Sequence, residues 1–416
     1  FWGDLWAPTD AREPDLSAWL WPLDQLSAFP TMRTLRGPEL AAVVRGTCKS
    51  KAPGADGWRY AELADWPPQL FAALARLLNM VEQHGRWPDG AWENVVCMLP
   101  KGGTGAPDDR RPIVLLSVLY RVWAAERAGY MKRWLVQNGI LRVGEGAGPD
   151  AQAGELAMLL ARARITGQHI AGLALDWSKC YDRLPLSAMR AVARRARMPL
   201  ALVGPMLQAD GLPRRVRADG LSGDLLDPTC GLAPGCSAAT HWLALFTLCW
   251  SAPIEAIAPT IRTRKYVDDM LAADEEDGQG VHSMADNVAA AWTVTDEWQR
   301  AAAWLLNLVK SNRFATSATL RALLRASAGP DVREGFLDLG VVQVAANRGQ
   351  PALLRKRLQG ALERFARCEA LPLPLTQRAL VVAASGVGAG LYGAGQHHVP
   401  EAELRRQAVL WGAWKG

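Results

Sequence analysis

Apolar residues recur at helical spacing in several long segments of this chain. Between residues 66 and 81 the apolar side chains recur at helical spacing, which predicts a packed helix; they are Leu70, Phe71, Leu74, Leu77, Leu78 and Val81. The same spacing predicts further helices at residues 117–135, 152–164, 186–209, 241–250, 288–306 and 353–367. Half of the 416 residues are hydrophobic, so the chain can bury a sizeable core and form two or three domains.

Short runs of apolar or β-branched residues lie between these helical segments. The runs at residues 92–99 and 170–175 predict strands, and residues 336–341 predict a strand followed by a turn. Residues 264–273 predict a hairpin with a tight turn at two adjacent acids, Asp268 and Asp269. Helices and strands therefore mix along the chain.

Composition excludes several classes of protein. The formal net charge of +6 permits an anionic partner, although a mildly basic solvated surface gives the same value. The seven cysteines form no CxxC pair, which disfavours zinc and a disulfide framework and favours a reducing compartment. No signal peptide is visible, and the apolar runs at residues 238–250 and 379–395 are too short or too glycine-rich to span a membrane.

The first residues of the chain contain no pattern that predicts a catalytic or binding site. Residues 1–47 are rich in Trp, Pro and Asp and have weak periodicity, so we expect an extension with short helices. The first residue is Phe1 rather than methionine, which we interpret as the start of a fragment.

Three carboxylates predict a metal site. Adjacent carboxylates repel each other, and a divalent cation such as Mg²⁺ explains a pair like Asp268 and Asp269 on a stiff hairpin. A solvated Asp-Asp turn is the alternative. Asp176 ends the apolar run 170–175, although an acid at the end of a strand is also often a helix cap. If the two strands are neighbours, the three acids can hold two Mg²⁺ ions for an in-line phosphoryl displacement.

Basic residues flank a glycine turn at residues 102–105, with Lys101 on one side and Arg111 on the other. A lysine point charge facing an arginine fork suits a triphosphate, and an exposed hairpin with ordinary surface charge is the alternative. The glycine spacing does not match a Walker A loop. The basic helix at residues 353–367 could follow a phosphate backbone or form a solvated face. Together with the acids, this constellation predicts a nucleotidyl transferase.

Seven motifs in order resemble the reverse transcriptase of non-LTR (LINE-type) retrotransposons, over residues 51–392. They lie at residues 51–58 (KxPGxDG), 99–116 (PKxG…RPI), 175–182 (DxxKAFD), 231–237 (GxxQG), 266–269 (YxDD), 307–310 (NxxK) and 336–340 (YLG).

This resemblance implies an α+β, right-hand polymerase fold with fingers, a palm containing an antiparallel sheet, and a helical thumb. The implied boundaries are 1–50 for an N-terminal extension, 51–168 for the fingers with the start of the palm, 169–345 for the palm and 346–416 for the thumb.

The resemblance also implies an RNA-directed DNA polymerase that extends a DNA primer on an RNA template with dNTPs. Its location would be intracellular and nuclear. Asp176, Asp268 and Asp269 would hold two Mg²⁺ ions, or Mn²⁺, with help from the carbonyl of Trp177. Lys310 would protonate the leaving pyrophosphate.

The remaining implied roles concern the nucleotide. Lys101 and Arg111 would grip the triphosphate, and Tyr181 would crowd the sugar 2′ position and favour deoxynucleotides. The loop with Pro234 and Gly235 would line the nucleotide pocket.

One residue departs from the family pattern. The family has Gln where this chain has Pro234, and proline offers no side-chain hydrogen bond and no backbone donor. A catalytically impaired relic that only binds nucleic acid is therefore an alternative. A group II intron-type maturase would need an intron-binding domain after the thumb, and a nucleotidyl cyclase would need neither the thumb nor the basic hairpin.

Overall fold

The computed structural model describes residues 1–8, 13–90, 92–101, 106–142, 148–275, 278, 280–346 and 352–381. The chain forms two compact units that interleave along the sequence. The first unit contains Phe1–Arg142, Asp176–Ile257 and Thr293–Asn307, and the second contains Val143–Leu175, Ala258–Trp292 and Leu308–Gly416.

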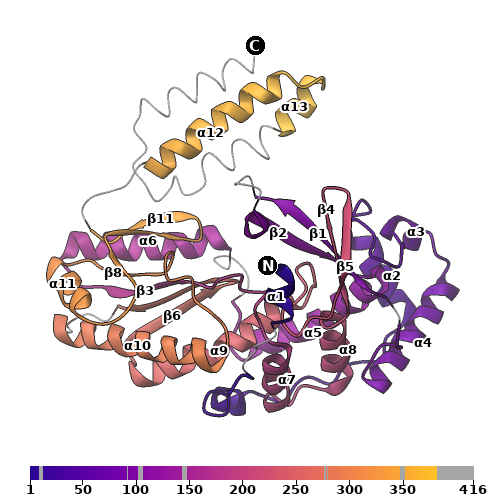
Figure 1. The fold of residues 1–416 in the computed structure, drawn as a ribbon, viewed down its shortest axis with the longest axis horizontal. Coiled ribbons are helices and arrows are strands. Elements are labelled where there is room, and N and C mark those ends of the chain that lie inside the picture. Colours follow the sequence, from indigo (N-terminus) through magenta and orange to yellow (C-terminus); the bar gives the residue numbers. More distant parts are fainter. Residues whose placement is uncertain are drawn as a thin grey trace. The chain divides into compact units, whose positions relative to one another are not determined.

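The first unit is mostly helical and contains one four-stranded sheet in the order β2-β1-β4-β5 (Figure 1). Its helices are α1 (Trp2–Trp6), η1 (Trp21–Gln25), α2 (Gly37–Gly46), α3 (Tyr60–Ala64), α4 (Pro68–His84), η2 (Pro107–Asp109), α5 (Val118–Gln137), α7 (Leu186–Arg195), α8 (Leu200–Asp210) and α9 (Ala239–Ile257). Its strands are β1 (Asn94–Pro100), β2 (Arg110–Leu115), β4 (Arg214–Ala218) and β5 (Leu221–Leu226). β1 is antiparallel to β2 and parallel to β4.

The predicted helix at residues 66–81 is confirmed as α4. Phe71, Leu74, Leu78 and Val81 are buried, as their spacing predicts. Leu70 and Leu77 were expected to pack with them but are 46% and 43% exposed. The helix ends at Gly85, whose φ of 65° is the left-handed conformation that glycine adopts at little cost.

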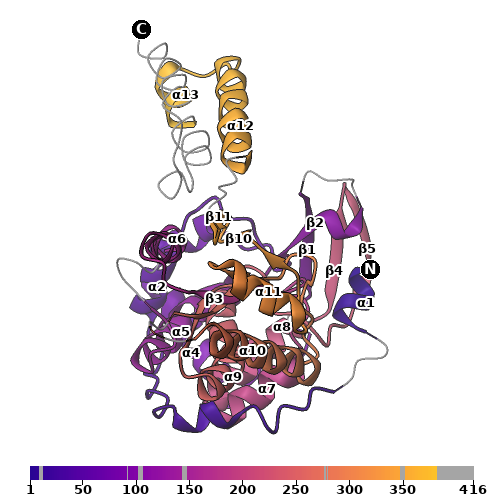
Figure 2. The same cartoon turned by 90° about the vertical axis from the view of Figure 1, so that its left-hand side faces the viewer.

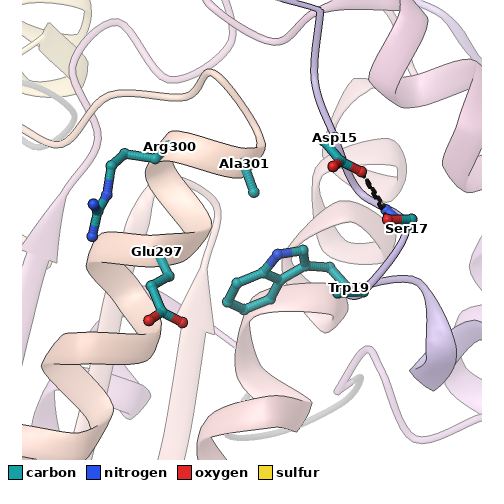
Figure 3. A pocket seen from close by; sticks show the side chains of 7 residues that line it. Asp15, Ser17, Trp19, Glu297, Arg300 and Ala301 are labelled. Carbon is teal, nitrogen blue, oxygen red and sulfur yellow. Dashed lines mark hydrogen bonds between the residues drawn. The ribbon is translucent and has the colours of Figure 1, made fainter.

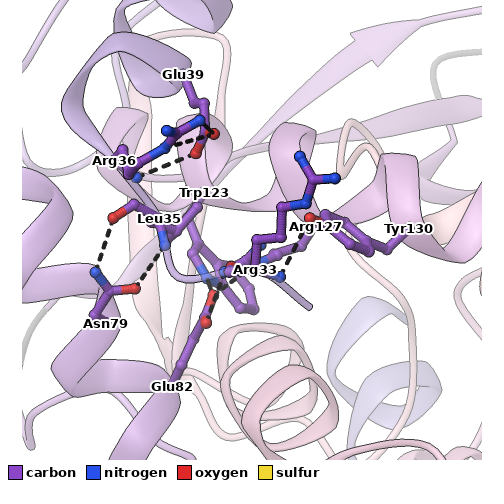
Figure 4. Close-up of polar contacts among 9 residues, drawn as sticks. All are labelled: Arg33, Leu35, Arg36, Glu39, Asn79, Glu82, Trp123, Arg127 and Tyr130. Atoms are coloured by element: carbon purple, nitrogen blue, oxygen red, sulfur yellow. Dashed lines mark hydrogen bonds and ion pairs between the residues drawn. The ribbon is translucent and has the colours of Figure 1, made fainter. Parts of the chain in front are cut away.

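Polar contacts fasten the segment before α2 to α4 and α5 (Figure 4). The Asn79 amide accepts from the backbone N–H of Leu35 and donates to its carbonyl, at 2.9 and 3.0 Å. The carboxylate of Glu82 accepts hydrogen bonds from the indole of Trp123 and the guanidinium of Arg127. Arg127 also donates to the carbonyl of Arg33, so a buried ion pair anchors this extended segment.

The prediction of one helix at residues 186–209 is wrong. The chain forms α7 and α8 with a break between them, at the position where Pro199 follows Met198. Proline disfavours helical dihedrals in the residue before it. Arg197 has a φ of 54°, which completes the break.

The second unit contains a five-stranded sheet in the order β6-β7-β3-β8-β9 and a separate pair, β10 and β11. The strands are β3 (Ala171–Asp176), β6 (Ile261–Tyr266), β7 (Asp269–Asp274), β8 (Asn312–Ala315), β9 (Val332–Arg333), β10 (Gly335–Asp338) and β11 (Val341–Val344). The helices are α6 (Pro149–Thr166), α10 (Val281–Ala301), which begins in this unit, α11 (Ala318–Ala326), α12 (Ala352–Glu369) and α13 (Leu375–Val381). Figure 1 shows α6 and α10 on opposite faces of the sheet.

The core of the second unit lies between α6 and the sheet. Leu156 and Leu160 of α6 pack with residues of β3, β7 and β8. Phe314 of β8 stacks on Phe336 of β10, with ring centroids 4.4 Å apart. Gly172 of β3 allows a close approach, because a Cβ there would lie 2.4 Å from the carbonyl oxygen of Ala272 on β7.

The predicted α+β class is confirmed, since helices accompany sheets that contain antiparallel pairs. The expected glycine turn at residues 102–105 and residues 382–392, the end of the stretch that resembles the family, lie outside the described residues. Within the described part of the chain, none of the helices combines the length and the apolar character that a membrane span requires. The domain boundaries predicted from the family pattern stay predictions.

Candidate functional site

The acidic hairpin in the second unit has a strained turn. Tyr266 of β6 pairs with Asp269 of β7, so the loop consists of Val267 and Asp268. The sequence predicted both acids in the turn, but Asp269 instead begins the returning strand. Val267 has a φ of 56°, which is unusual for a β-branched side chain, and it is 36% exposed. Strain of this kind clusters at functional sites.

Polar side chains lie beneath this hairpin. A small cavity of about 10 Å³ is lined by residues that include Asp269, Gln152, Arg264 and Asp338. Arg264 forms an ion pair with Glu275. Burial raises the pKa of Asp338 to about 6, against the opposing effects of Arg264 and a hydrogen bond from Gln343. Partly buried charged side chains therefore accompany the strand pairing at this hairpin.

Lys310 is exposed and lies two residues before β8. β8 is antiparallel to β3, with Asn312 opposite Ala174. Ala174 is two residues before the end of β3, and Lys310 is two residues before Asn312, the partner of Ala174. Lys310 therefore lies at the same edge of the sheet as the C-terminal end of β3.

The donor atoms of the hairpin suit a hard cation. Adjacent carboxylates at Asp268 and Asp269 supply the oxygen ligands that Mg²⁺ prefers. Among the described residues, no group of three or more His, Cys, Asp and Glu side chains is arranged to hold a metal ion. Asp268 and Asp269 therefore have the type of ligand atom that a divalent cation requires, and a complete metal site needs further ligands.

The basic residues lie on one hairpin of the first unit. Arg111 of β2 pairs with Leu99 of β1, and the N–H of Lys101 donates to the carbonyl of Asp109 at 2.9 Å. Both basic side chains are exposed. The predicted strand pairing is thus present, with Arg111 on β2 and Lys101 directly after the last residue of β1, two residues beyond the partner of Arg111.

The segment that follows β3 is fixed on one side by an aromatic stack. Trp177 is buried and stacks on Trp304, with ring centroids 3.8 Å apart and planes 7° apart. The carbonyl of Asp176 accepts from the N–H of Asn307 at 2.8 Å. The carbonyl of Tyr181 accepts from the N–H of Leu232 at 3.0 Å, which connects this segment to the glycine loop at residues 231–237.

The glycine loop also contacts the basic hairpin. The carbonyl of Pro234 accepts from the N–H of Val114 on β2 at 3.3 Å. Gly231 and Gly235 have backbone φ angles of 99° and 105°, which residues with a side chain rarely adopt. Three segments predicted to face the nucleotide, namely the hairpin, the segment with Tyr181 and the glycine loop, are therefore joined by hydrogen bonds in the first unit.

Sequence reasoning missed two buried charges behind the glycine loop. Asp210 accepts from the N–H of Ala233 at 2.8 Å, and burial raises its pKa to about 7. The guanidinium of Arg214 is fully buried and donates to the carbonyls of Gly231, at 2.6 Å, and Asp210, at 3.1 Å. Arg214 stands in a run of basic residues that resembles ordinary surface charge, so the sequence offered no signal of its burial.

A further cavity, of about 330 Å³, contains none of the predicted site residues (Figure 3). Trp19, Glu297 and Arg300 line it, and the Asp15 carboxylate accepts two hydrogen bonds from Ser17. Those bonds stabilise a local turn. The cavity is therefore accounted for by the packing of the N-terminal segment on α10.

No protein-family model matches the chain. Among solved structures, the chain is similar to the RNA-dependent RNA polymerase of a human picorbirnavirus, with 11% identity and a TM-score of 0.49 over 97% of this chain and 76% of that one. The insertion loop deletion mutant of that polymerase gives 11% identity and a TM-score of 0.48 over 99% and 81%. Similarity at this level identifies neither a fold nor an activity by itself.

Proposed function

We propose that this chain is an RNA-directed DNA polymerase of the non-LTR type, which extends a DNA primer on an RNA template. The ordered motifs support this function. The observation that carries it is the sheet order, in which β3, ending at Asp176, is the neighbour of β7, which begins at Asp269.

The close approach of these two strands supports the grouping of the acids. Gly172 of β3 lies against Ala272 and Ala273 of β7. Asp176 is four residues further along β3, and Asp268 and Asp269 are about four residues back along β7. An antiparallel pairing of β3 with β7 puts the end of β3 beside the start of β7. The described side chains form no three-carboxylate metal group as they stand, so the proposal requires Asp176 to join Asp268 and Asp269 when cations bind.

Each residue then has a role in nucleotidyl transfer. Asp176, Asp268 and Asp269, with the Trp177 carbonyl, would hold two divalent cations, which neutralise charge on the reacting phosphate. Lys310 would donate a proton to the leaving pyrophosphate.

The first unit would supply the nucleotide contacts. Lys101 and Arg111 would bind triphosphate oxygens from one hairpin, and charge-assisted hydrogen bonds to phosphate are among the strongest available. Tyr181 would occupy the space that a ribose 2′-hydroxyl needs, beside the loop with Pro234 and Gly235.

A primer-extension assay on an RNA template with dNTPs and Mg²⁺ tests the function. Asp268→Asn should lower incorporation at least a hundredfold, about 3 kcal/mol of transition-state stabilisation, because a neutral amide binds the cation weakly. Asp286→Asn, an exposed substitution on α10, is the control and should leave incorporation unchanged. Undiminished activity in Asp268→Asn would show that the metal site lies elsewhere.

Pro234 supports a second candidate function, that of a nucleic-acid-binding relic. Its carbonyl is engaged by Val114, and its ring cannot supply the amide contact that the family pattern has there. This candidate predicts salt-dependent binding of an RNA–DNA duplex without incorporation. Incorporation that appears only in Pro234→Gln would locate the defect in the glycine loop, and robust wild-type activity would exclude the relic.

A further inference from the structure

Trp6, in the segment expected to be without chemistry, connects two of the segments predicted to face the nucleotide. Its side chain is fully buried, and its indole N–H donates to Oδ1 of Asp182 at 3.0 Å. Its carbonyl accepts from the N–H groups of Thr229, at 2.8 Å, and Cys230, at 3.0 Å, directly before the glycine loop. One residue therefore holds the segment of Tyr181 and the start of the glycine loop together.

The charged side chain of Arg214 contacts both Trp6 and the glycine loop. Its guanidinium lies 4.8 Å from the centre of the Trp6 ring and donates to the carbonyl of Gly231. Within the described part of the chain, its Nε and Nη1 have no hydrogen-bond partner. Arginine does not lose its proton in proteins, so the indole face provides part of the stabilisation that water would otherwise give.

The same helix contacts the basic hairpin. The indole N–H of Trp2 donates to the carbonyl of Pro107 at 3.0 Å. The ammonium of Lys179 lies 4.7 Å from the Trp2 ring and donates to the carbonyl of Asp108 at 2.7 Å. Figure 2 shows α1 next to β4 and β5, and Gly3 lies against Leu226 of β5. α1 thus contacts the basic hairpin, the segment with Tyr181 and the two residues directly before the glycine loop.

We propose that Trp6 is a positioning residue that sets the discrimination between deoxynucleotides and ribonucleotides. The inference rests on the proposed polymerase function. Trp6 acts on Tyr181 in two ways. It holds the neighbouring residue, Asp182, through the indole hydrogen bond. It also holds the residues before the glycine loop, in which the N–H of Leu232 donates to the carbonyl of Tyr181. A shift of either loop changes the space that Tyr181 leaves at the 2′ position of the sugar.

The environment of Asp182 makes the indole contact important. The side chain is buried, so water cannot replace a lost donor. Burial raises the pKa of Asp182, while the hydrogen bond from Trp6 and the charge of Arg214 act in the opposite direction. Loss of the indole N–H therefore weakens the contact that fixes this loop.

A matched pair of substitutions tests the proposal. Trp6→Phe keeps an aromatic ring over Arg214 and removes the N–H. Trp298→Phe removes a similar volume from another fully buried indole, whose Nε1 has no hydrogen-bond partner in the described structure. Single-nucleotide incorporation with a dNTP and the matching NTP gives kcat and KM for each variant.

We expect Trp6→Phe to reduce the dNTP preference roughly tenfold, mainly through KM, because a buried charge-assisted hydrogen bond is lost. Trp298→Phe should retain the wild-type preference, whatever its effect on stability. Equal preferences in the two variants would overturn the proposal, since Trp6 would then only fill space.

A second measurement does not depend on activity. Hydrogen exchange should accelerate in Trp6→Phe at the amides of Thr229, Cys230 and Leu232 and stay at the wild-type rate there in Trp298→Phe. Unchanged exchange in Trp6→Phe would overturn the positioning role. If the wild-type chain incorporates no nucleotide, the proposed function fails, and this exchange measurement still decides whether Trp6 holds the loops.

Discussion

At the scale of single residues, backbone strain occurs in the acidic hairpin of the second unit, and buried charge occurs behind the glycine loop of the first unit. Val267 holds a left-handed conformation beside two acids, and Asp210 and Arg214 lie without solvent behind the glycine loop. The conformation of Val267 constrains the backbone of the acidic hairpin, and Asp210 and Arg214 constrain the backbone of the glycine loop. The proposed chemistry requires each backbone to stay in one position.

Val267→Gly should raise the free energy of unfolding by up to about 1 kcal/mol. Glycine adopts a positive φ without the steric cost that valine carries, and the gain exceeds the loss of a partly exposed side chain. Incorporation should nevertheless fall several-fold, because the hairpin gains freedom. Urea unfolding checks the stability, and Val332→Gly in β9, with no positive φ to relieve, should be destabilising. A less stable Val267→Gly protein would contradict the strain.

Asp210→Asn should alter how stability depends on pH. The folded-state pKa of about 7 exceeds the ordinary value of 3.8, so the folded chain holds this proton more tightly than the unfolded chain. The resulting stabilisation is complete below pH 3.8 and is lost as the pH rises through about 7. It amounts to about 4 kcal/mol at most.

Denaturant unfolding from pH 4 to pH 8 measures this dependence. The wild type should lose stability relative to Asp210→Asn over that range, because the amide keeps the bond from Ala233 and does not titrate. Asp286→Asn, an exposed change, should run parallel to the wild type. Parallel curves for Asp210→Asn would show that the carboxyl is ionised in the folded chain throughout.

At the scale of elements, the sequence predicted most helices and strands, because burial follows periodicity in α4, α5 and α6. It missed the break between α7 and α8, although Pro199 marks it, and it placed both acids in the turn of the hairpin. The periodicity of apolar residues does not determine which residues form the turn of a hairpin, because the turn position depends on the register of the two strands. The roles of Trp6 and Arg214 were also beyond reach, since they arise from contacts between residues far apart in sequence.

Breaking the buried ion pair between α4 and α5 should be strongly destabilising. Arg127→Met leaves Glu82 buried without its cation and should cost about 3–5 kcal/mol. Arg127→Met with Glu82→Leu should recover much of that loss, because two apolar groups replace the pair. Arg300→Met breaks an exposed pair with Asp296 and should cost less than about 1 kcal/mol. Urea unfolding compares the three, and similar costs for the two single variants would contradict the role of burial.

At the scale of the whole molecule, the helix predicted at residues 353–367 is present as α12, and its role as a thumb stays a prediction. Its exposed cations include Lys356, Arg364 and Arg367. If this helix follows a phosphate backbone, replacing all three by Gln should reduce the slope of log affinity against log salt by roughly two to three for an RNA–DNA duplex. Replacing Arg76, Arg86 and Arg325, exposed in other elements, provides the control. Equal slopes in the two triple variants would remove α12 from the duplex interface.

The interleaving of the two units has a consequence for synthesis of the protein. Residues 293–307 complete the first unit, whose first long segment ends at Arg142. At about 5–20 residues per second, a ribosome needs roughly 10–30 s to make the intervening chain. During that interval the nascent first unit exposes apolar surface that its last segment will cover, including the ring of Phe246, which packs on Trp298 and Trp304. We therefore expect chaperones to bind the nascent chain until late in translation and to release it once residue 307 has emerged from the ribosome.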